Sequence, residues 1–262
     1  MKKIGLLFLG LVTQIVFAQA NRFVYQVTMK TDSTEKSNST TEIANLDVSA
    51  GSSIFYAENR LKRDSLMARA RQGGGFNFDM TAMQGLRTNM DYLIEKEYKT
   101  GKKLYKARIL RDQYAYEEDR PMNWKILPET ATIGDYKTQK AETDFAGRTW
   151  YAWFTTEVPF QDGPYKFSGL PGLIVKVEDS NGDYSFDLKE SKKINEIASF
   201  EQRGSVINVK RAVFAKQQEQ FNKDPMAAMA TMGNKMRLQM DPNVRKRLEE
   251  RQKKNNNPIE LK

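Results

Sequence analysis

The stretch Gly169-Leu-Pro-Gly-Leu-Ile-Val-Lys-Val-Glu-Asp-Ser-Asn-Gly-Asp-Tyr-Ser-Phe-Asp-Leu188 is the most informative part of this chain for its architecture. Pro171 and Gly172 predict a type II turn, because proline supplies a φ of about −65° at the second position and glycine the positive φ at the third. Asn181-Gly182 predicts a type I′ turn between two strands of alternating apolar and polar residues. We therefore expect an antiparallel β-hairpin here.

Similar alternations recur on the N-terminal side of this hairpin, separated by polar turns. We expect strands at residues 23–30, 42–48, 53–56, 92–98, 104–110, 113–118 and 149–154. Short strands at regular spacing favour one antiparallel sheet over βαβ units, which need long crossovers. The sequence therefore predicts a mainly β (α+β) fold, a curved antiparallel sheet or partial barrel with a few peripheral helices.

The remaining regions have helical or polar composition. Helices are expected at 58–70 and 211–240, the second punctuated by Asp224-Pro225. Residues 245–262 are charged, rich in asparagine and nearly free of apolar side chains, which predicts disorder. The chain then divides into a signal peptide (1–20), an antiparallel β domain (21–210) and a helical, Met-rich segment with a basic disordered tail (211–262).

Aromatic residues gather around the expected strand at 149–154, and Arg148 precedes it. One hypothesis is an aromatic-lined ligand cleft beneath a Gly/Pro-rich lid. The alternative, which we favour, is a packed core under a rigid loop. Arg148 is expected to form an ion pair with Asp144 or Glu157 rather than to bind a ligand carboxylate or phosphate. The candidate ligand-binding residues are Arg148, Trp150, Tyr151, Trp153, Tyr165 and Phe167.

Residues 136–188 resemble the GLPGLI family of exported Bacteroidetes proteins. The landmarks occur in order: Tyr136–Ala141, Phe145–Phe154, Val158-Pro159, Gly163–Phe167, and the hexapeptide Gly169, Leu170, Pro171, Gly172, Leu173, Ile174. The resemblance covers only this part of the chain. It implies an exported lineage and a structural motif in the hexapeptide, but no biochemical reaction, so no catalytic residue carries over.

The absence of histidine and cysteine excludes many kinds of active site. No Ser-His-Asp or Cys-His pair can form, and zinc or haem sites that need imidazole or thiolate ligands are excluded. Carboxylate chemistry remains, and the region around 114–116 carries candidates at Asp112, Glu117, Glu118 and Asp119. We favour a non-enzymatic protein without metal or cofactor over a carboxylate-dependent hydrolase acting on an envelope polymer or glycan.

The N-terminus predicts export. Lys2 and Lys3 precede an apolar stretch at 4–12, and small residues near position 18 predict signal-peptide cleavage after Ala18 or Ala20. No later stretch is long and apolar enough for a transmembrane helix. The net charge of +9 is spread along the chain, which favours solubility over nucleic-acid binding. We expect a periplasmic or secreted protein.

Methionines recur at helical spacing near the C-terminus, which places their thioethers on one helical face. This face predicts a helix packed on the domain, a contact with lipid or an outer-membrane protein, or soft ligation of Cu(I), and we favour packing. The residues are Met226, Met229, Met232, Met236 and Met240. Together these patterns predict an envelope protein that binds an apolar ligand or an outer-membrane protein partner.

Overall fold

The computed structural model describes residues 19–72, 80–110, 112–202, 204–223, 246 and 254–262. The strands are β1 (Ala20–Met29), β2 (Thr40–Val48), β3 (Ser52–Ala57), β4 (Tyr92–Glu97), β5 (Lys103–Ile109), β6 (Asp112–Glu117), β7 (Lys125–Ile133), β8 (Tyr136–Phe145), β9 (Arg148–Thr155), β10 (Leu173–Asp179), β11 (Tyr184–Ile194) and β12 (Val206–Asn208). The helices are α1 (Glu58–Gln72), α2 (Met80–Gly85) and α3 (Arg211–Lys223).

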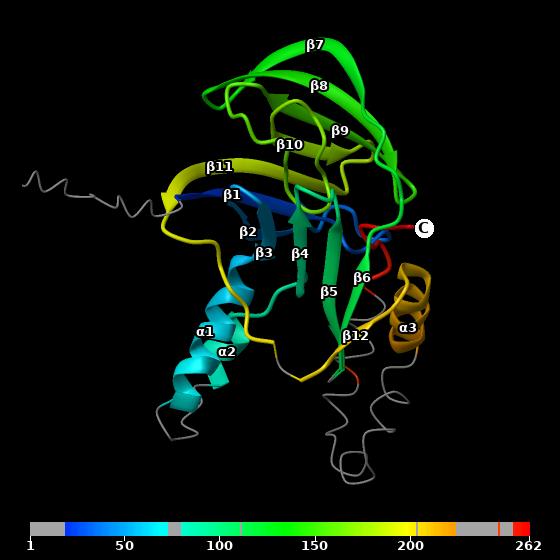
Figure 1. Cartoon of the computed structure of the whole chain (residues 1–262). Helices are drawn as coiled ribbons and strands as arrows, with labels where there is room; N and C mark the ends of the chain where they lie inside the picture. The colour runs from blue at the N-terminus through cyan, green and yellow to red at the C-terminus, as the bar shows by residue number, and fades with distance from the viewer. Residues whose placement is uncertain (1–18, 73–79, 111, 203, 224–245, 247–253) are drawn as a thin grey trace, which may run out of the picture.

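The strands form one open sheet of twelve strands in the order β12-β6-β5-β4-β3-β2-β1-β11-β10-β9-β8-β7. The sheet curves strongly, so that β4, β5 and β6 run across the direction of β1 and β11 (Figure 1). The predicted mainly β fold with a curved sheet is therefore confirmed. One pair differs from the prediction, because β12 runs parallel to β6 and makes the sheet mixed. After β11, the eighth strand in this order, the chain crosses to the β6 edge of the sheet, where it forms β12.

The predicted hairpin is β10 and β11, which pair antiparallel with Val177 opposite Phe186. Its turn differs from type I′, in which both central residues need positive φ. Gly182 has a φ of 64°, whereas Asn181 does not share this conformation. The Gly182 N–H donates to the Asp179 carbonyl at 2.9 Å. The connection is therefore a four-residue loop closed by a left-handed glycine.

The Pro171-Gly172 turn also differs in detail from the type II prediction. The Gly172 N–H donates to the Leu170 carbonyl at 2.7 Å, and the Leu173 N–H donates instead to Val158 at 3.2 Å. Gly172 does have positive φ, at 152°. A Cβ at this position would lie 1.9 Å from the Thr155 carbonyl oxygen. Glycine is required here because two backbone segments approach closely, in addition to its φ.

The two faces of the sheet carry separate apolar clusters. Alternation along β3 sends Phe55 to the large cluster, which defines the inner face, and Ile54 and Tyr56 to a smaller cluster on the outer face. The loop between β9 and β10 (residues 156–172) fills the inner face, where Phe167 is fully buried. The Phe167 ring contacts the rings of Trp124, Phe145, Trp150, Tyr165 and Phe186.

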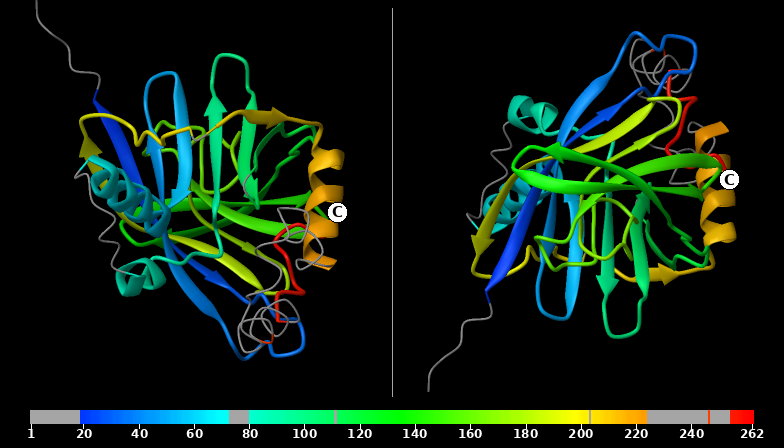
Figure 2. Two further views of the ribbon diagram at one scale, coloured as in Figure 1. Left: turned by 90° about the horizontal axis from the view of Figure 1, so that it is seen from below. Right: turned by 90° about the horizontal axis from the view of Figure 1, so that it is seen from above.

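Two helices, α1 and α3, lie on opposite sides of the molecule (Figures 1 and 2). α1 confirms the helix expected at 58–70 and contacts β2 and β3, with Leu61 against the outer cluster. α3 packs on β5 and β6 through buried Phe214. Within the described part of the chain, no helix combines the length and apolar character needed to cross a membrane.

The remaining predictions concern the N-terminal and C-terminal parts of the chain. Residues 1–18 and 224–245 lie outside the described residues, and with them most of the expected signal peptide and Met226, Met229, Met232, Met236 and Met240. The structure differs from the predicted disorder at residues 254–262, called the C-terminal segment below. Asn257 in this segment is buried, and Ile259 packs against the inner cluster.

Candidate functional site

Three of the five aromatic residues proposed to line a cleft pack against one another in the core. Trp150 lies with Tyr165 and Phe167 in the inner core, and all three are at most 2% exposed. Tyr151 and Trp153 point to the other face of β9, where the Lys140 ammonium lies 4.7 and 5.7 Å from their ring centroids. The side chains therefore leave no open cleft among the predicted residues, and another part of the surface must be considered.

Arg148 forms an ion pair, but not with the partners expected from sequence. Its Nη1 atom lies 2.7 Å from an Asp179 oxygen and 3.3 Å from an Asp183 oxygen. Asp144 and Glu157 instead accept from Thr149 and from the Lys137 backbone. The antiparallel register of β9 and β10, with Asp179 opposite Trp150, brings the β10–β11 turn beside the start of β9.

The four candidate carboxylates have different surroundings. Glu118 accepts from Lys166 and Arg120 at 2.6 and 2.7 Å. Burial raises the pKa of Glu118, but the hydrogen bond from Arg120 and the charge of Lys166 outweigh it and hold the pKa at about 2. Asp119 pairs with Arg211, and Asp112 is exposed. A carboxyl group with so low a pKa cannot serve as a general acid near neutral pH.

A hollow on the outer face has a volume of about 690 Å³. We call it the outer pocket. Ile54, Leu93 and Leu104 supply apolar surface from three adjacent strands, and the chain at 197–202 forms a wall that includes Phe200. Its polar lining residues are Ser52, Ser53, Arg60, Glu95, Lys96, Glu97, Lys102, Lys106, Gln113, Glu117, Ser199, Glu201 and Gln202. A volume of a few hundred Å³ is typical of small-molecule sites. In the outer pocket the apolar walls alternate with many polar and charged side chains.

Two buried polar groups in the outer pocket lack hydrogen-bond partners. Arg60 is 4% exposed, and its Nε and Nη1 atoms have no hydrogen-bond partner among the described residues. Asp91 and Asp64 supply counter-charge, with Nη1 3.5 Å from an Asp91 oxygen, and the guanidinium lies 5.7 Å from the Phe200 ring centroid. Gln113 is 7% exposed, and its Oε1 atom has no donor. Burial lowers the pKa of Arg60, with Asp91 acting in the opposite direction.

Buried polar groups without partners are rare, because each costs about 1 to 3 kcal/mol when no hydrogen bond replaces water. In the outer pocket the free groups are guanidinium donors and an amide acceptor. They match a ligand that carries an acceptor, such as an oxyanion, and a hydroxyl or amide donor. Sequence reasoning missed Arg60 and Gln113, since nothing in the pattern of a charged helix or a polar strand position marks them.

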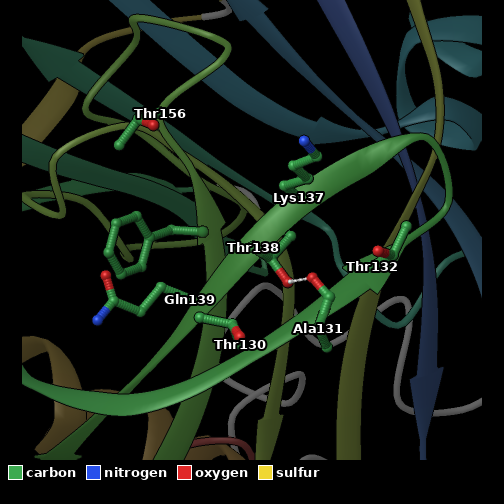
Figure 3. Close-up of a pocket in the computed structure, with 8 residues that line it drawn as sticks. Thr130, Ala131, Thr132, Lys137, Thr138, Gln139 and Thr156 are labelled. Atoms are coloured by element: carbon green, nitrogen blue, oxygen red, sulfur yellow. Dashed lines mark hydrogen bonds between the residues drawn. The ribbon is translucent and has the colours of Figure 1, made fainter.

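A second hollow of about 560 Å³ lies over β7 and β8 and is shown in Figure 3. Its lining is mostly threonine, lysine and glutamine, and two of these side chains are bound to backbone carbonyls of β7. Thr138 donates to the Ala131 carbonyl at 2.8 Å, and Gln139 donates to Leu127 at 2.9 Å. The outer pocket is the stronger candidate site, because its buried polar groups are the ones that lack partners.

A buried charge pair on the inner face is fully partnered. Lys96 donates to Asp162 at 2.5 Å and to the carbonyls of Gly163 and Phe167. Asp162 also accepts from Ser53 and Tyr98 at 2.5 and 2.7 Å. Burial lowers the pKa of Lys96, and Asp162 opposes this effect. These contacts fasten the loop between β9 and β10 to the sheet, which gives the pair a structural role.

Comparison with known proteins gives a family of unknown function and a fold. A family model described as "Protein of unknown function (Porph_ging)" matches residues 145–176. These residues fall inside the stretch that resembles the GLPGLI family, although the two family names differ. The matched part runs from the end of β8 into β10 and contains none of the residues that line the outer pocket.

Two solved structures of PNGF-II, in the P21 and C2 space groups, are similar in fold. Each has a TM-score of 0.52 and covers 76% of this chain, at 17% and 15% identity. This chain spans about a third of the length of the PNGF-II chains, 33% and 32%. The likeness at this identity concerns the fold alone. No curated protein matches the chain.

Proposed function

We propose that this protein is a non-enzymatic binding protein of the bacterial envelope, and that the outer pocket takes a small amphipathic anion. The observation that carries the proposal is the buried guanidinium of Arg60 beside apolar walls, because its Nε and Nη1 atoms have no hydrogen-bond partner among the described residues. An oxyanion would accept from Nε and Nη1, and an apolar body would cover Ile54, Leu93 and Phe200. Such a ligand would supply hydrogen-bond acceptors to the buried Arg60 donors, which removes the free-energy cost of leaving them unsatisfied. It would also bury apolar surface.

An envelope location is the companion proposal. It is supported by the predicted signal peptide and by the resemblance to an exported family. The predicted alternative of an outer-membrane protein partner concerns the Met-rich segment and stays a prediction. A periplasmic or secreted protein would meet lipid-derived carboxylates and phosphates, which are amphipathic anions of the proposed chemistry.

The proposal is tested by titrating the full chain with dodecanoate, dodecyl phosphate and dodecanol in a calorimeter. We expect one site for each anion, and binding of dodecanol at least 10-fold weaker, because the alcohol carries no charge for Arg60. A preference between the two anions would distinguish a carboxylate ligand from a phosphate ligand. Absence of binding by both anions would remove the basis of the proposal.

A matched pair of variants on α1 localises the site. Arg60→Met keeps a long apolar side chain but removes the donors, and should weaken anion binding at least 10-fold. Arg63→Met is the control, because Arg63 also pairs with Asp91, at 2.5 Å, and does not line the outer pocket. Equal loss in both variants would indicate a general charge effect rather than a site at Arg60.

A further inference from the structure

The C-terminal segment lies near α3 (Figure 2). We call the set of charged and tyrosine side chains that contact it the C-terminal groove. The side chains that contact the segment here are Arg120, Arg148, Tyr165, Lys166 and Tyr184. They come from the chain after β6, the start of β9, the loop between β9 and β10, and β11. The fold assembles this groove from four distant parts of the sequence.

Asn257 is recognised through both ends of its side-chain amide. Its Oδ1 atom accepts from Arg148 Nη2 at 2.6 Å, and its Nδ2 atom donates to the Lys30 carbonyl at 2.8 Å. Its backbone is also bound, since its N–H donates to Thr31 and its carbonyl accepts from the Tyr184 hydroxyl at 2.5 Å. An aspartate or a leucine could not satisfy both side-chain contacts.

Glu260 is recognised by three groups at once. Its carboxylate accepts from the Tyr165 hydroxyl and from Lys166 at 2.5 Å each, and from Arg120 at 2.8 Å. The Lys166 ammonium is in turn surrounded by the rings of Tyr105, Tyr116 and Tyr165, with centroids 4.9, 5.0 and 5.4 Å away. Charge-assisted hydrogen bonds of this kind are the strong ones, and they fix the position of the carboxylate.

The groove also binds the backbone of the segment. Arg148 donates to the carbonyls of Pro258 and Ile259 at 2.8 and 3.1 Å. The Ala146 carbonyl accepts from the N–H groups of Leu261 and Lys262. Among the described residues, three other than glycine have positive φ, and two of them, Ala146 and Tyr165, contact the segment. Backbone strain of this kind gathers where a ligand is clamped.

The cations of the groove keep carboxylate partners that do not belong to the segment. Arg148 has Asp179 and Asp183, while Arg120 and Lys166 share Glu118. Removal of the segment would therefore leave no buried cation without a counter-charge, which is the costly outcome for a buried ion. The Arg148 atoms Nε and Nη2 donate to the segment, whereas Nη1 serves the aspartates. The positive charges of the groove are therefore balanced when the segment is absent. The Nε and Nη2 atoms of Arg148 would then be available to bind a peptide.

The chain length allows the segment to reach another molecule. Residues 224–253 connect α3 to the segment, and a chain of that length spans at most roughly 100 Å when extended. A second copy carries the same residues and would make the same contacts in the groove. Exchange of an identical element between two copies closes as a symmetric pair at low energetic cost.

We propose that the C-terminal groove is a peptide-recognition site for the Asn257-Pro-Ile-Glu260 pattern, occupied in exchange by the C-terminal segment of the same chain and by that of a second copy. The proposal is separate from the outer pocket, which lies on the opposite face of the sheet, so the failure of either leaves the other standing. It assigns to Arg148 and Tyr165 the recognition of a peptide rather than of a small ligand.

The test uses the full chain with Asn257→Ala and Glu260→Gln, which weakens its own segment and leaves the groove intact. The probe is a fluorescent peptide of residues 254–262. We expect one bound peptide per chain, at least 10-fold tighter than to the wild type, where the tethered segment competes. A peptide with glutamine in place of Glu260 should bind at least 10-fold more weakly. A folded variant that binds neither peptide, or both equally, would overturn the proposal.

Two measurements on the wild-type chain complete the test and do not depend on the variant folding. In hydrogen exchange, the amides of Asn257, Leu261 and Lys262 should exchange faster than the paired amides of β1 and β2. Exchange as slow as that of the sheet would mark the segment as a permanent part of the fold. Light scattering should find dimers that increase with protein concentration. A monomer at all concentrations would overturn the assignment of a second copy as donor.

Discussion

The loop between β9 and β10 and the C-terminal segment contact the same part of the molecule and have opposite compositions. The loop is rich in glycine, proline and aromatic residues, and Phe167 and Leu170 place it in the core. The C-terminal segment, Lys-Asn-Asn-Asn-Pro-Ile-Glu-Leu-Lys, has little to bury and is held by hydrogen bonds and ion pairs. Lys166 of the loop and Glu260 of the segment join the two regions directly. A polar segment can therefore be ordered by ion pairs with charged side chains that the rest of the fold positions.

The largest effect is expected where two backbones meet in the loop. Gly172→Ala should destabilise the protein by more than about 3 kcal/mol, because the new Cβ would collide with the Thr155 carbonyl and the φ would be strained. Gly169→Ala is the control, since Gly169 has a φ of 94° but no atom within 4 Å of the added Cβ. It should cost about 1 kcal/mol. Equal midpoints in urea would show that contact with Thr155 does not matter.

The attachment of the loop to the sheet should rank next. Lys96→Met removes one partner of a buried pair and should cost about 3 kcal/mol, because Asp162 is left buried with only neutral donors. Lys102→Met, which disrupts an exposed pair with Glu117, should cost less than about 0.5 kcal/mol. Chemical denaturation of both variants checks this difference. A Lys96 variant as stable as the Lys102 variant would show that the pair is not needed to hold the loop.

The C-terminal segment should contribute less than the loop. Glu260→Gln keeps the shape of the side chain but removes its charge opposite Lys166 and Arg120, and should cost about 1 to 2 kcal/mol. Leu261→Ala, at a side chain that is half exposed, should cost below about 0.5 kcal/mol. If Glu260→Gln destabilised the protein as much as Gly172→Ala, the segment would be as integral to the fold as the loop.

The smallest effect is a difference in acid sensitivity. Burial raises the pKa of Glu260, but Lys166 and Arg120 outweigh it and the pKa lies below its usual value; the pKa of Glu118 is about 2. A carboxyl group with a lowered folded-state pKa stabilises the fold above its unfolded pKa of about 4.3, and this stability is lost as the pH falls through the folded value. Wild-type stability should therefore fall from about pH 5 toward pH 2. Glu260→Gln should show a shallower slope in this range, and an identical slope would contradict the assigned charge state.

Much of the fold followed from local patterns. Alternation around Val177 and Phe186 predicted the central hairpin, and the polar turn at Gly101 lies between β4 and β5 as expected. The edge strand β7 was not predicted, because most of its side chains are exposed and Pro128 interrupts its pattern. Its register shifts between Ile126 and Thr130, which also removes a regular alternation.

The candidate sites were harder to predict than the fold. Arg148 was singled out correctly as a charge with a partner, but Asp179 and Asp183 are contributed by a neighbouring hairpin. Arg60 and Gln113 lie more than fifty positions apart and meet the same pocket because α1 and the chain at 197–202 flank β3 to β6. No local sequence pattern predicts that these two residues line one pocket, because their proximity depends on the curvature of the sheet.

The sequence by itself determined the secondary structure of most of the sheet, the positive φ of Gly172 and the absence of imidazole and thiolate chemistry. These properties depend on side-chain type and on periods of a few residues, which are present in the linear chain. Only the tertiary structure decided the ion-pair partners of Arg148, the burial of Arg60 donors without hydrogen bonds, and the position of residues 254–262. Those depend on groups that are distant in sequence, and burial in a common low-dielectric environment makes their charges and hydrogen bonds matter.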